Sequence, residues 1–501
     1  MFSLPEDITI LLNPDTMAFC VSSDKTNELL ENFYVSKGES GEKIHHIPSQ
    51  KIKKPGELKD VFSALRVGNL VADRKIKLLN PKEIKKSCKK RIIPDSDITI
   101  IPYAGCNLRC SYCWNTHGTY AAPGSSASVM SQDTIKQTAR WLVDIIKSGS
   151  AKNRINKIGF FGGEPLFGTD AFLTIVKAVR KAEKQNTKKI EILLDTNGTL
   201  LNDELILFCK HHEVKIGVSL DGPEQLHDSA RVDASGRGTH ALVVDVIKKI
   251  QAVCPNLLVI RSTAALQSDM LAINDYMHDM GFSDFSSVLV GNVRIGAQCG
   301  EIFSDYNLAH CREKRYEFIK TYIGRLVSRE NLYFLPDFFG MVTNGLSHKP
   351  RFYICNLGLG GFSILPDGAI VSCYLFAFDR SRKIGNVFDG IDYEAVARQK
   401  NFARSHPVWA YEECRKCFAR YKCGGPCYAH NLAFTGDMAK FSNKACQRAR
   451  EEYIMEMYAT TLLAKKDPAF FKKFQENNSK KEGRKDIRKL FEEYYVRKEA
   501  N

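Results

Sequence analysis

Residues 105–114 read Gly105-Cys106-Asn107-Leu108-Arg109-Cys110-Ser111-Tyr112-Cys113-Trp114. This loop follows the apolar segment ITIIPY at residues 98–103, which is typical of a β-strand. Three thiolates spaced Cys-x3-Cys-x2-Cys can bind three irons of a [4Fe–4S] cube, and the fourth iron then has no local protein ligand. Such an iron is open to a small chelating molecule. A zinc site is the alternative, but zinc favours four ligands and paired Cys-x2-Cys spacing.

Outward from this loop, residues 96–295 alternate strand-like and helix-like segments. KIGFF precedes AFLTIVKAVRKAEK, EILLDT precedes DELILFCKHH, and VKIGVSL precedes HALVVDVIKKIQAV. Six such units with no long insertion predict a parallel sheet covered by helices. Enzymes of that architecture carry their chemistry on the loops after the carboxyl ends of the strands. The cysteine loop is in that position.

Three further motifs follow predicted strands in the same way. They are Phe161-Gly162-Gly163-Glu164-Pro165, Asp195-Thr196-Asn197-Gly198-Thr199 and Ser219-Leu220-Asp221-Gly222-Pro223. Together with the cysteine loop, and in this order, they resemble the radical S-adenosylmethionine (SAM) enzymes. The resemblance covers residues 96–295 and implies an α/β fold, a partial (β/α)6 TIM-like barrel.

The resemblance also implies roles for individual residues. Cys106, Cys110 and Cys113 would ligate the [4Fe–4S] cluster that binds SAM. The expected SAM contacts are the GGEP motif (Gly162, Gly163, Glu164, Pro165), Asn197 of the TNG segment, Ser219 and Arg231. Backbone and Glu164 would receive the SAM amino group, and Arg231 its carboxylate. Reductive cleavage of SAM would give a 5′-deoxyadenosyl radical that abstracts hydrogen from the substrate. The sequence assigns no catalytic acid or base.

A second group of cysteines lies in residues 351–450, where apolar periodicity is weak and metal would be needed for folding. It comprises Cys355, Cys373, Cys414, Cys417, Cys423, Cys427 and Cys446. One or two zinc sites are one reading, but the pattern resembles SPASM domains, which hold two auxiliary [4Fe–4S] clusters. The resemblance assigns Cys355, Cys373 and Cys427 to auxiliary cluster I. It assigns Cys414, Cys417, Cys423 and Cys446 to auxiliary cluster II, giving three clusters in all.

Auxiliary cluster I has only three cysteines in this assignment. Its fourth iron would be open to a substrate thiolate, because iron accepts soft sulfur ligands. His348 is an alternative fourth ligand, although a single histidine in a loop is more often simply solvated.

The remaining segments flank the barrel. Residues 1–95 read as a small α+β module, in which DITILLN and MAFCVS flank the turn NPDT and a helix is expected over residues 57–71. The module resembles the recognition element that binds the leader of a ribosomally made peptide as an added strand. Nine Lys and Arg residues at 74–91 suit an acidic leader. A plain cap on the barrel is the alternative. Residues 296–350 form a helical bridge, and residues 451–501 a basic helical tail.

Composition excludes several classes of protein. The chain has 501 residues, 44% of them hydrophobic, and a net charge of +15, so it can bury large cores and is not disordered throughout. No apolar run is long enough to cross a bilayer, and the N-terminus has no signal-peptide pattern. We therefore expect a cytoplasmic protein without a membrane partner. In that compartment 16 cysteines indicate metal or redox chemistry rather than disulfides.

Most relatives with this domain pair modify peptides or proteins. The resemblance therefore predicts a maturase of a precursor peptide with a leader, served by an electron donor such as a flavodoxin or ferredoxin. The loop from Cys113 to Tyr120 is similar to those of enzymes that form cysteine thioether crosslinks in sactipeptides and ranthipeptides. Carbon–carbon or carbon–oxygen crosslinking remains an alternative.

Two other substrate classes compete. Anaerobic sulfatase maturases oxidise Cys or Ser to formylglycine, and they carry an Asp directly after the cysteine that corresponds to Cys373. Tyr374 stands there in this chain, and the module at 1–95 is additional. An RNA-modifying enzyme is permitted by the charge. A nucleic-acid partner is not expected, because the cysteine-rich region has no basic platform with interleaved aromatic residues.

Overall fold

The computed structural model describes most of the chain beyond residue 95. The described residues are 2–4, 8–13, 18–21, 35–37, 43–45, 96–113, 115, 129–147, 155–183, 189–265, 268–282, 285–290, 308–347, 350–355, 357, 361–377, 379–440, 443–480 and 486–496. The helix expected at 57–71, the basic stretch at 74–91, residues 116–120 of the thioether-like loop and His348 lie outside them.

A ten-stranded sheet organises the fold, and its first six strands are parallel neighbours in chain order. They are β6 (Ser96–Ile100), β7 (Ile155–Phe160), β8 (Glu191–Thr196), β9 (Val214–Ser219), β10 (Leu258–Ala265) and β11 (Phe285–Val290). The α/β fold and its six predicted strands are therefore confirmed. Because all six run parallel, the motifs that follow β6 to β9 meet at one edge of the sheet.

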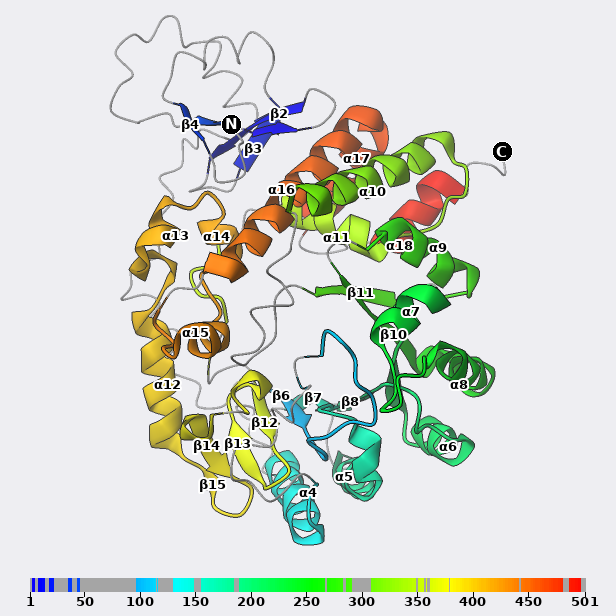
Figure 1. The fold of residues 1–501 in the computed structure, drawn as a ribbon, viewed down its shortest axis with the longest axis vertical. Helices are drawn as coiled ribbons and strands as arrows, with labels where there is room; N and C mark the ends of the chain where they lie inside the picture. The colour runs from blue at the N-terminus through cyan, green and yellow to red at the C-terminus, as the bar shows by residue number, and fades with distance from the viewer. Residues whose placement is uncertain are drawn as a thin grey trace, which may run out of the picture.

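Helices cover the outer face of these strands (Figure 1). They are α4 (Gln132–Lys147), α5 (Thr169–Glu183), α6 (Asp203–His211), α7 (Glu224–Ala230), α8 (His240–Val253) and α9 (Met270–Asp279), with short helices η1 (Pro165–Gly168) and η2 (Pro255–Leu257). In α8, Val243, Val246, Ile247 and Ile250 recur at helical spacing and are buried in the common core.

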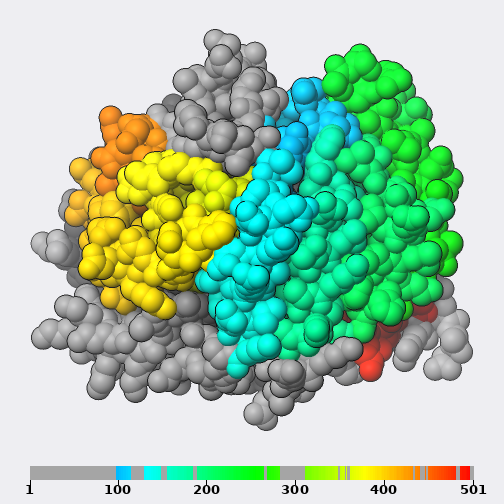
Figure 2. Space-filling model, turned by 90° about the horizontal axis from the view of Figure 1, so that it is seen from below, coloured from blue at the N-terminus to red at the C-terminus, as the bar shows by residue number. Residues whose placement is uncertain are grey.

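The cysteine-rich region continues the same sheet. β12 (Gly361–Ile364) pairs parallel with β6, and β13 (Ala369–Val371), β14 (Lys383–Asn386) and β15 (Gly390–Ile391) follow antiparallel. Gln137 of α4 donates a hydrogen bond to the Val387 carbonyl at 3.0 Å. Figure 2 shows the yellow β12–β15 segment directly against the cyan α4. The sequence did not predict this join, which holds the second cysteine group against the barrel.

Short helices complete the cysteine-rich region. They are η3 (Tyr374–Phe376), η4 (Arg380–Arg382), α12 (Tyr393–Ser405), η5 (Val408–Ala410), α13 (Glu412–Lys416), α14 (Arg420–Cys423) and α15 (Tyr428–Thr435).

A further group of helices packs together beyond β11 (Figure 1). They are α10 (Leu308–Ser328), α11 (Pro336–Gly345), α16 (Asn443–Lys466), α17 (Pro468–Ser479) and α18 (Ile487–Phe491), followed by the π-helical turn η6 (Glu492–Val496). α10 and α11 lie within residues 296–350, where a helical bridge was expected. Within the described residues, none of the helices has the length and apolarity needed to cross a bilayer.

The described part of residues 1–95 consists of short strands. β1 (Phe2–Leu4), β2 (Ile8–Asn13) and β3 (Ala18–Val21) form an antiparallel sheet, and β4 (Val35–Lys37) pairs with β5 (Lys43–His45). The hairpin expected around the turn NPDT is β2–β3. β3 lies beside α16.

Candidate functional site

The cysteine loop after β6 brings its three thiols together. Cys110 is buried, whereas Cys106 and Cys113 are half-buried. Burial raises the pKa of the Cys110 thiol to about 12; Arg231 opposes this shift, and the charges of Cys113 and Cys106 add to it. Burial also raises the pKa of Cys106. Cys106 and Cys110 thiols that resist ionisation beside Cys113 need a metal centre to hold them as thiolates. This donor set fits the predicted iron–sulfur cluster.

Glu164 is fully buried at the start of η1. Its Oε1 accepts hydrogen bonds from Thr196 Oγ1 at 2.7 Å and Leu166 N–H at 3.1 Å, and its Oε2 accepts from Asn197 N–H at 2.8 Å. Burial raises the pKa of Glu164 to about 7, and the three hydrogen bonds oppose that shift. A carboxylate accepts about four hydrogen bonds. Oε2 therefore retains an acceptor position for a ligand amino group.

The two glycines before Glu164 allow the motif to lie against the cysteine loop. A Cβ on Gly163 would lie 1.7 Å from the Gly105 carbonyl oxygen, so only glycine fits there. Gly162 adopts a φ of +139°, which disfavours other residues. Glu164 N–H donates to the same Gly105 carbonyl at 2.8 Å. The buried Pro165 begins η1 directly after this contact.

Asn197 ties the third motif to the same loop. Its Nδ2 donates to Asn107 Oδ1 at 2.9 Å and lies 3.6 Å from Cys106 Sγ. Its Oδ1 accepts from the Thr199 backbone N–H at 2.9 Å. The cysteine loop, GGEP and TNG segments therefore form one hydrogen-bonded unit.

Arg231 lies on the other side of the cysteine loop, where it makes a bidentate ion pair with Asp221. Nε and Nη2 donate to the two carboxylate oxygens at 2.8 and 3.1 Å. Tyr112 O–H and the Thr263 backbone N–H donate to the same carboxylate. Four hydrogen bonds fill the acceptor capacity of Asp221 and indicate a positioning role for it. Arg231 has two further donors on Nη1. Ser219 lies half-buried at the end of β9.

Cys355, Cys373 and Cys427 lie close enough for the charges of neighbouring thiols to affect one another. Burial raises the pKa of Cys355 to about 12, and the charges of Cys427 and Cys373 add to the shift. Burial likewise raises the pKa of Cys373 to about 11. The ring of Tyr374 contacts Phe161 of the GGEP segment, with ring centroids 5.3 Å apart. This contact joins the predicted auxiliary site I to the barrel.

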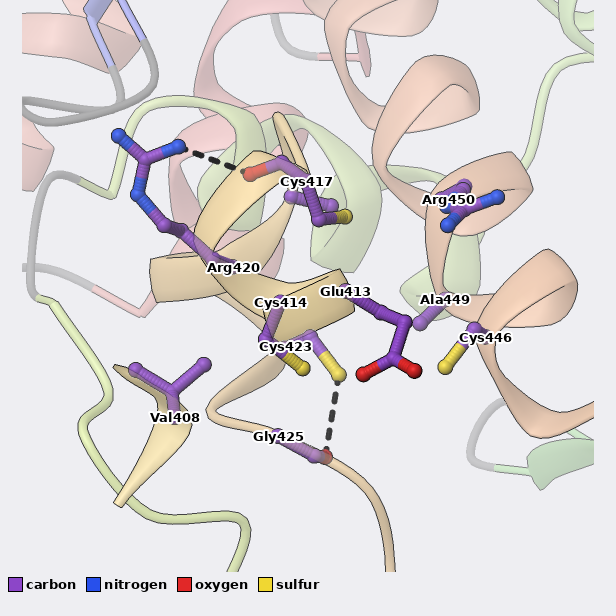
Figure 3. Close-up of a pocket in the computed structure, with 11 residues that line it drawn as sticks. Val408, Glu413, Cys414, Cys417, Arg420, Cys423, Gly425, Cys446, Ala449 and Arg450 are labelled. Carbon is purple, nitrogen blue, oxygen red and sulfur yellow. Dashed lines mark hydrogen bonds between the residues drawn. The ribbon is translucent and has the colours of Figure 1, made fainter. Parts of the chain in front are cut away.

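The other four cysteines, Cys414, Cys417, Cys423 and Cys446, line a single pocket (Figure 3). Its empty volume is about 330 Å³, including its open mouth. Burial raises the pKa of Cys414 and of Cys446 to about 12, and the neighbouring thiols add to both shifts. Arg450 lies close enough to oppose them. Four thiols around one cavity fit the predicted auxiliary site II.

Within the described ranges, no three His, Cys, Asp or Glu side chains converge as ligands of a single metal ion. A [4Fe–4S] cluster binds each thiolate to a different iron, so its ligands surround a larger volume. The three cysteine groups are therefore candidate sites for clusters.

Sequence reasoning assigned no role to two neighbours of these motifs. Tyr112 lies within the cysteine loop, and Asp195 directly precedes the TNG segment. Asp195 forms an ion pair with Arg261 of β10, with Oδ1 3.2 Å from Nε. Asp195 could have been found from the sequence as an acidic residue at the carboxyl end of a predicted parallel strand.

Comparison with known proteins identifies the barrel. Residues 100–265 match the model of the radical SAM superfamily. These residues form a radical SAM domain. The described relatives include the "Cysteine-type anaerobic sulfatase-maturating enzyme" of Clostridium perfringens (strain 13 / Type A), 25% identical and covering 67% of this chain and 89% of that protein. The "Serine-type anaerobic sulfatase-maturating enzyme" of Bacteroides thetaiotaomicron is 22% identical, and the match covers 69% of this chain and 85% of that protein.

Solved structures show the same fold. "Native anSMEcpe with bound AdoMet" superposes with a TM-score of 0.55 at 19% identity, covering 74% of this chain and 99% of that one. Streptococcus suis SuiB bound to precursor peptide SuiA superposes with a TM-score of 0.51 at 18% identity. The match covers 89% of this chain and 100% of that one. The chain thus has an α/β fold that contains a radical SAM domain at residues 100–265, followed by a C-terminal cysteine-rich region.

Proposed function

We propose that this enzyme oxidises a cysteine or serine side chain of a peptide or protein to formylglycine. The observation that carries the proposal is the match to cysteine-type and serine-type sulfatase-maturating enzymes over two thirds of this chain. The Phe161–Tyr374 contact supports it, since it holds a second cysteine group beside the radical SAM motifs. The comparisons favour this alternative over the thioether crosslink that the sequence first suggested.

This reaction would require SAM and three [4Fe–4S] clusters. The three cysteine groups would hold the clusters. When bound, SAM and its cluster supply a 5′-deoxyadenosyl radical that abstracts hydrogen from the substrate. Glu164 Oε2 would accept a hydrogen bond from the SAM amino group, and Arg231 Nη1 would donate to its carboxylate. Gly163 would let the backbone approach SAM closely. Ser219 is proposed as a further SAM contact.

Thioether formation in a precursor peptide is the second candidate. Tyr374 favours it, because sulfatase maturases carry an Asp at that position. The strands within residues 1–95 also favour it, since they are an additional unit that could bind a leader peptide. Both candidates need an electron donor such as a flavodoxin or ferredoxin.

Product analysis separates the two. The reconstituted enzyme is incubated anaerobically with SAM, a reductant and a Cys-containing sulfatase-type peptide, alongside its Ser counterpart. We expect an aldehyde from either peptide, with sulfide released from the Cys peptide. Loss of two hydrogens with sulfur retained and no alkylatable thiol would instead identify a thioether. SAM cleavage with neither peptide changed would contradict the proposal.

A further inference from the structure

Asp195 lies on the inner face of the sheet. Its neighbours Ile192 and Leu194 on β8 belong to the core beneath the helices, so Asp195 points to the opposite face. Its register partner on β9 is Gly217, where a Cβ would lie 2.3 Å from Asp195 Oδ1. The glycine therefore makes room for the carboxylate. The Asp195 side chain remains 25% exposed, which leaves it accessible to a ligand.

Asp195 lies between the two groups of motifs. The next two residues, Thr196 and Asn197, bind Glu164 and approach Cys106. On the other side, Tyr374 contacts Phe161 and lies near enough to Asp195 for the carboxylate charge to affect it. Asp195 is therefore close to both the SAM motifs and the proposed auxiliary site I.

Titratable groups from three other parts of the fold interact with Asp195. Arg261 of β10 is ion-paired to it, Lys157 of β7 acts on it through its charge, and Tyr374 of the cysteine-rich region lies near enough to be affected by the carboxylate charge. Burial raises the pKa of Asp195, whereas Arg261 and Lys157 oppose the shift. Because burial outweighs the two cations, the carboxylate is a stronger base than a solvated one, and the ion pair with Arg261 fixes its orientation.

We propose that Asp195 accepts the proton of the thiol or hydroxyl group of the substrate residue being oxidised. The S–H or O–H bond breaks, an O–H bond forms on the Asp195 carboxylate, and the electron pair stays on the substrate sulfur or oxygen. The inference rests on the proposed function and deepens it. Sulfatase maturases carry a carboxylate at the position of Tyr374. In this chain, Asp195 on barrel strand β8 would take its place.

The test compares Asp195→Asn with Glu191→Gln. Glu191 is on the same strand and the same face, and it is also ion-paired, to Lys215 at 2.8 Å and Lys157 at 3.6 Å, but at the far end of the strand. Product per 5′-deoxyadenosine is measured with the Cys and Ser peptides, together with peptide affinity and iron content. We expect D195N to lower the product ratio about 100-fold at pH 7.5, and E191Q to leave it unchanged.

The pH profile separates a proton acceptor from a structural residue. A thiol ionises by itself near pH ~8.5, whereas a serine hydroxyl does not ionise in this range. D195N should therefore recover activity towards pH 9 on the Cys peptide but not on the Ser peptide. A wild-type product ratio and profile in D195N would overturn the inference. The inference would also be overturned if the lower product ratio of D195N came with lower iron content or weaker peptide binding and was not restored at high pH. If the wild-type enzyme converts neither peptide, the proposed function fails and this inference fails with it.

Discussion

At the scale of single residues, burial and hydrogen bonding set the properties of Glu164, the proposed contact of the SAM amino group. Thr196, Asn197 and Leu166 supply three donors to one carboxylate, and burial brings its pKa to about 7. The resemblance to radical SAM enzymes made Glu164 a candidate, because its motif is local and follows a strand. It could not identify Asp195, whose position depends on the register of β8, β9 and β10 and on the space left by Gly217.

The pKa of Glu164 leads to a pH-dependent affinity for SAM. Burial raises its pKa to about 7, so the carboxylate proposed to accept the SAM amino group becomes protonated as pH falls through about 7. We expect the Kd for SAM to rise roughly five- to tenfold between pH 7.5 and pH 6, measured by titration calorimetry on the cluster-loaded enzyme. Glu164→Gln should bind SAM more weakly at pH 7.5 and show no such change. A wild-type Kd that is constant over this range would contradict the role of Glu164.

At the scale of elements, the contact between the GGEP segment and the cysteine loop is the closest constraint in the site. Gly163 faces the Gly105 carbonyl without space for a side chain, whereas Gly159 of β7 has open space around its missing Cβ. The two glycines are four residues apart and provide a matched pair. A glycine motif read from sequence suggests such a contact, but only the fold identifies the partner.

Gly163→Ala should therefore separate the two segments. We expect a loss of about 1–3 kcal/mol in the free energy of unfolding, together with reduced iron incorporation, because neither backbone can yield easily. Denaturant titration and iron analysis measure the two effects. Gly159→Ala is the control and should retain both properties. Equal behaviour of the two variants would show that the close approach is unimportant.

At the scale of the whole molecule, one sheet joins the barrel to the cysteine-rich region through the β6–β12 pair. The sequence indicated both regions from their motifs. It did not indicate that they share a sheet, because strand patterns do not specify pairing partners far apart in the chain. The choice between formylglycine and thioether products also stayed open, since none of the motifs in the sequence distinguishes the two reactions.

The three cysteine groups should differ in their importance for folding. Replacing Cys106, Cys110 and Cys113 with Ala should remove about a third of the iron and abolish SAM cleavage, while the protein remains folded. Replacing Cys414 should lower both iron content and soluble yield, since that region depends more on its cluster. Cys254→Ala, outside all three groups, is the control. Full iron content in the first variant would contradict the cluster assignment.

The central claim is that the enzyme abstracts hydrogen from the side chain that it oxidises. The most direct measurement uses a substrate peptide deuterated at the Cβ of its reactive cysteine, and follows the label into 5′-deoxyadenosine by mass spectrometry. We expect deuterium in 5′-deoxyadenosine together with the aldehyde product. Product formation with unlabelled 5′-deoxyadenosine would show that hydrogen is taken from another position, as a crosslinking reaction at a different carbon requires, and would contradict the claim.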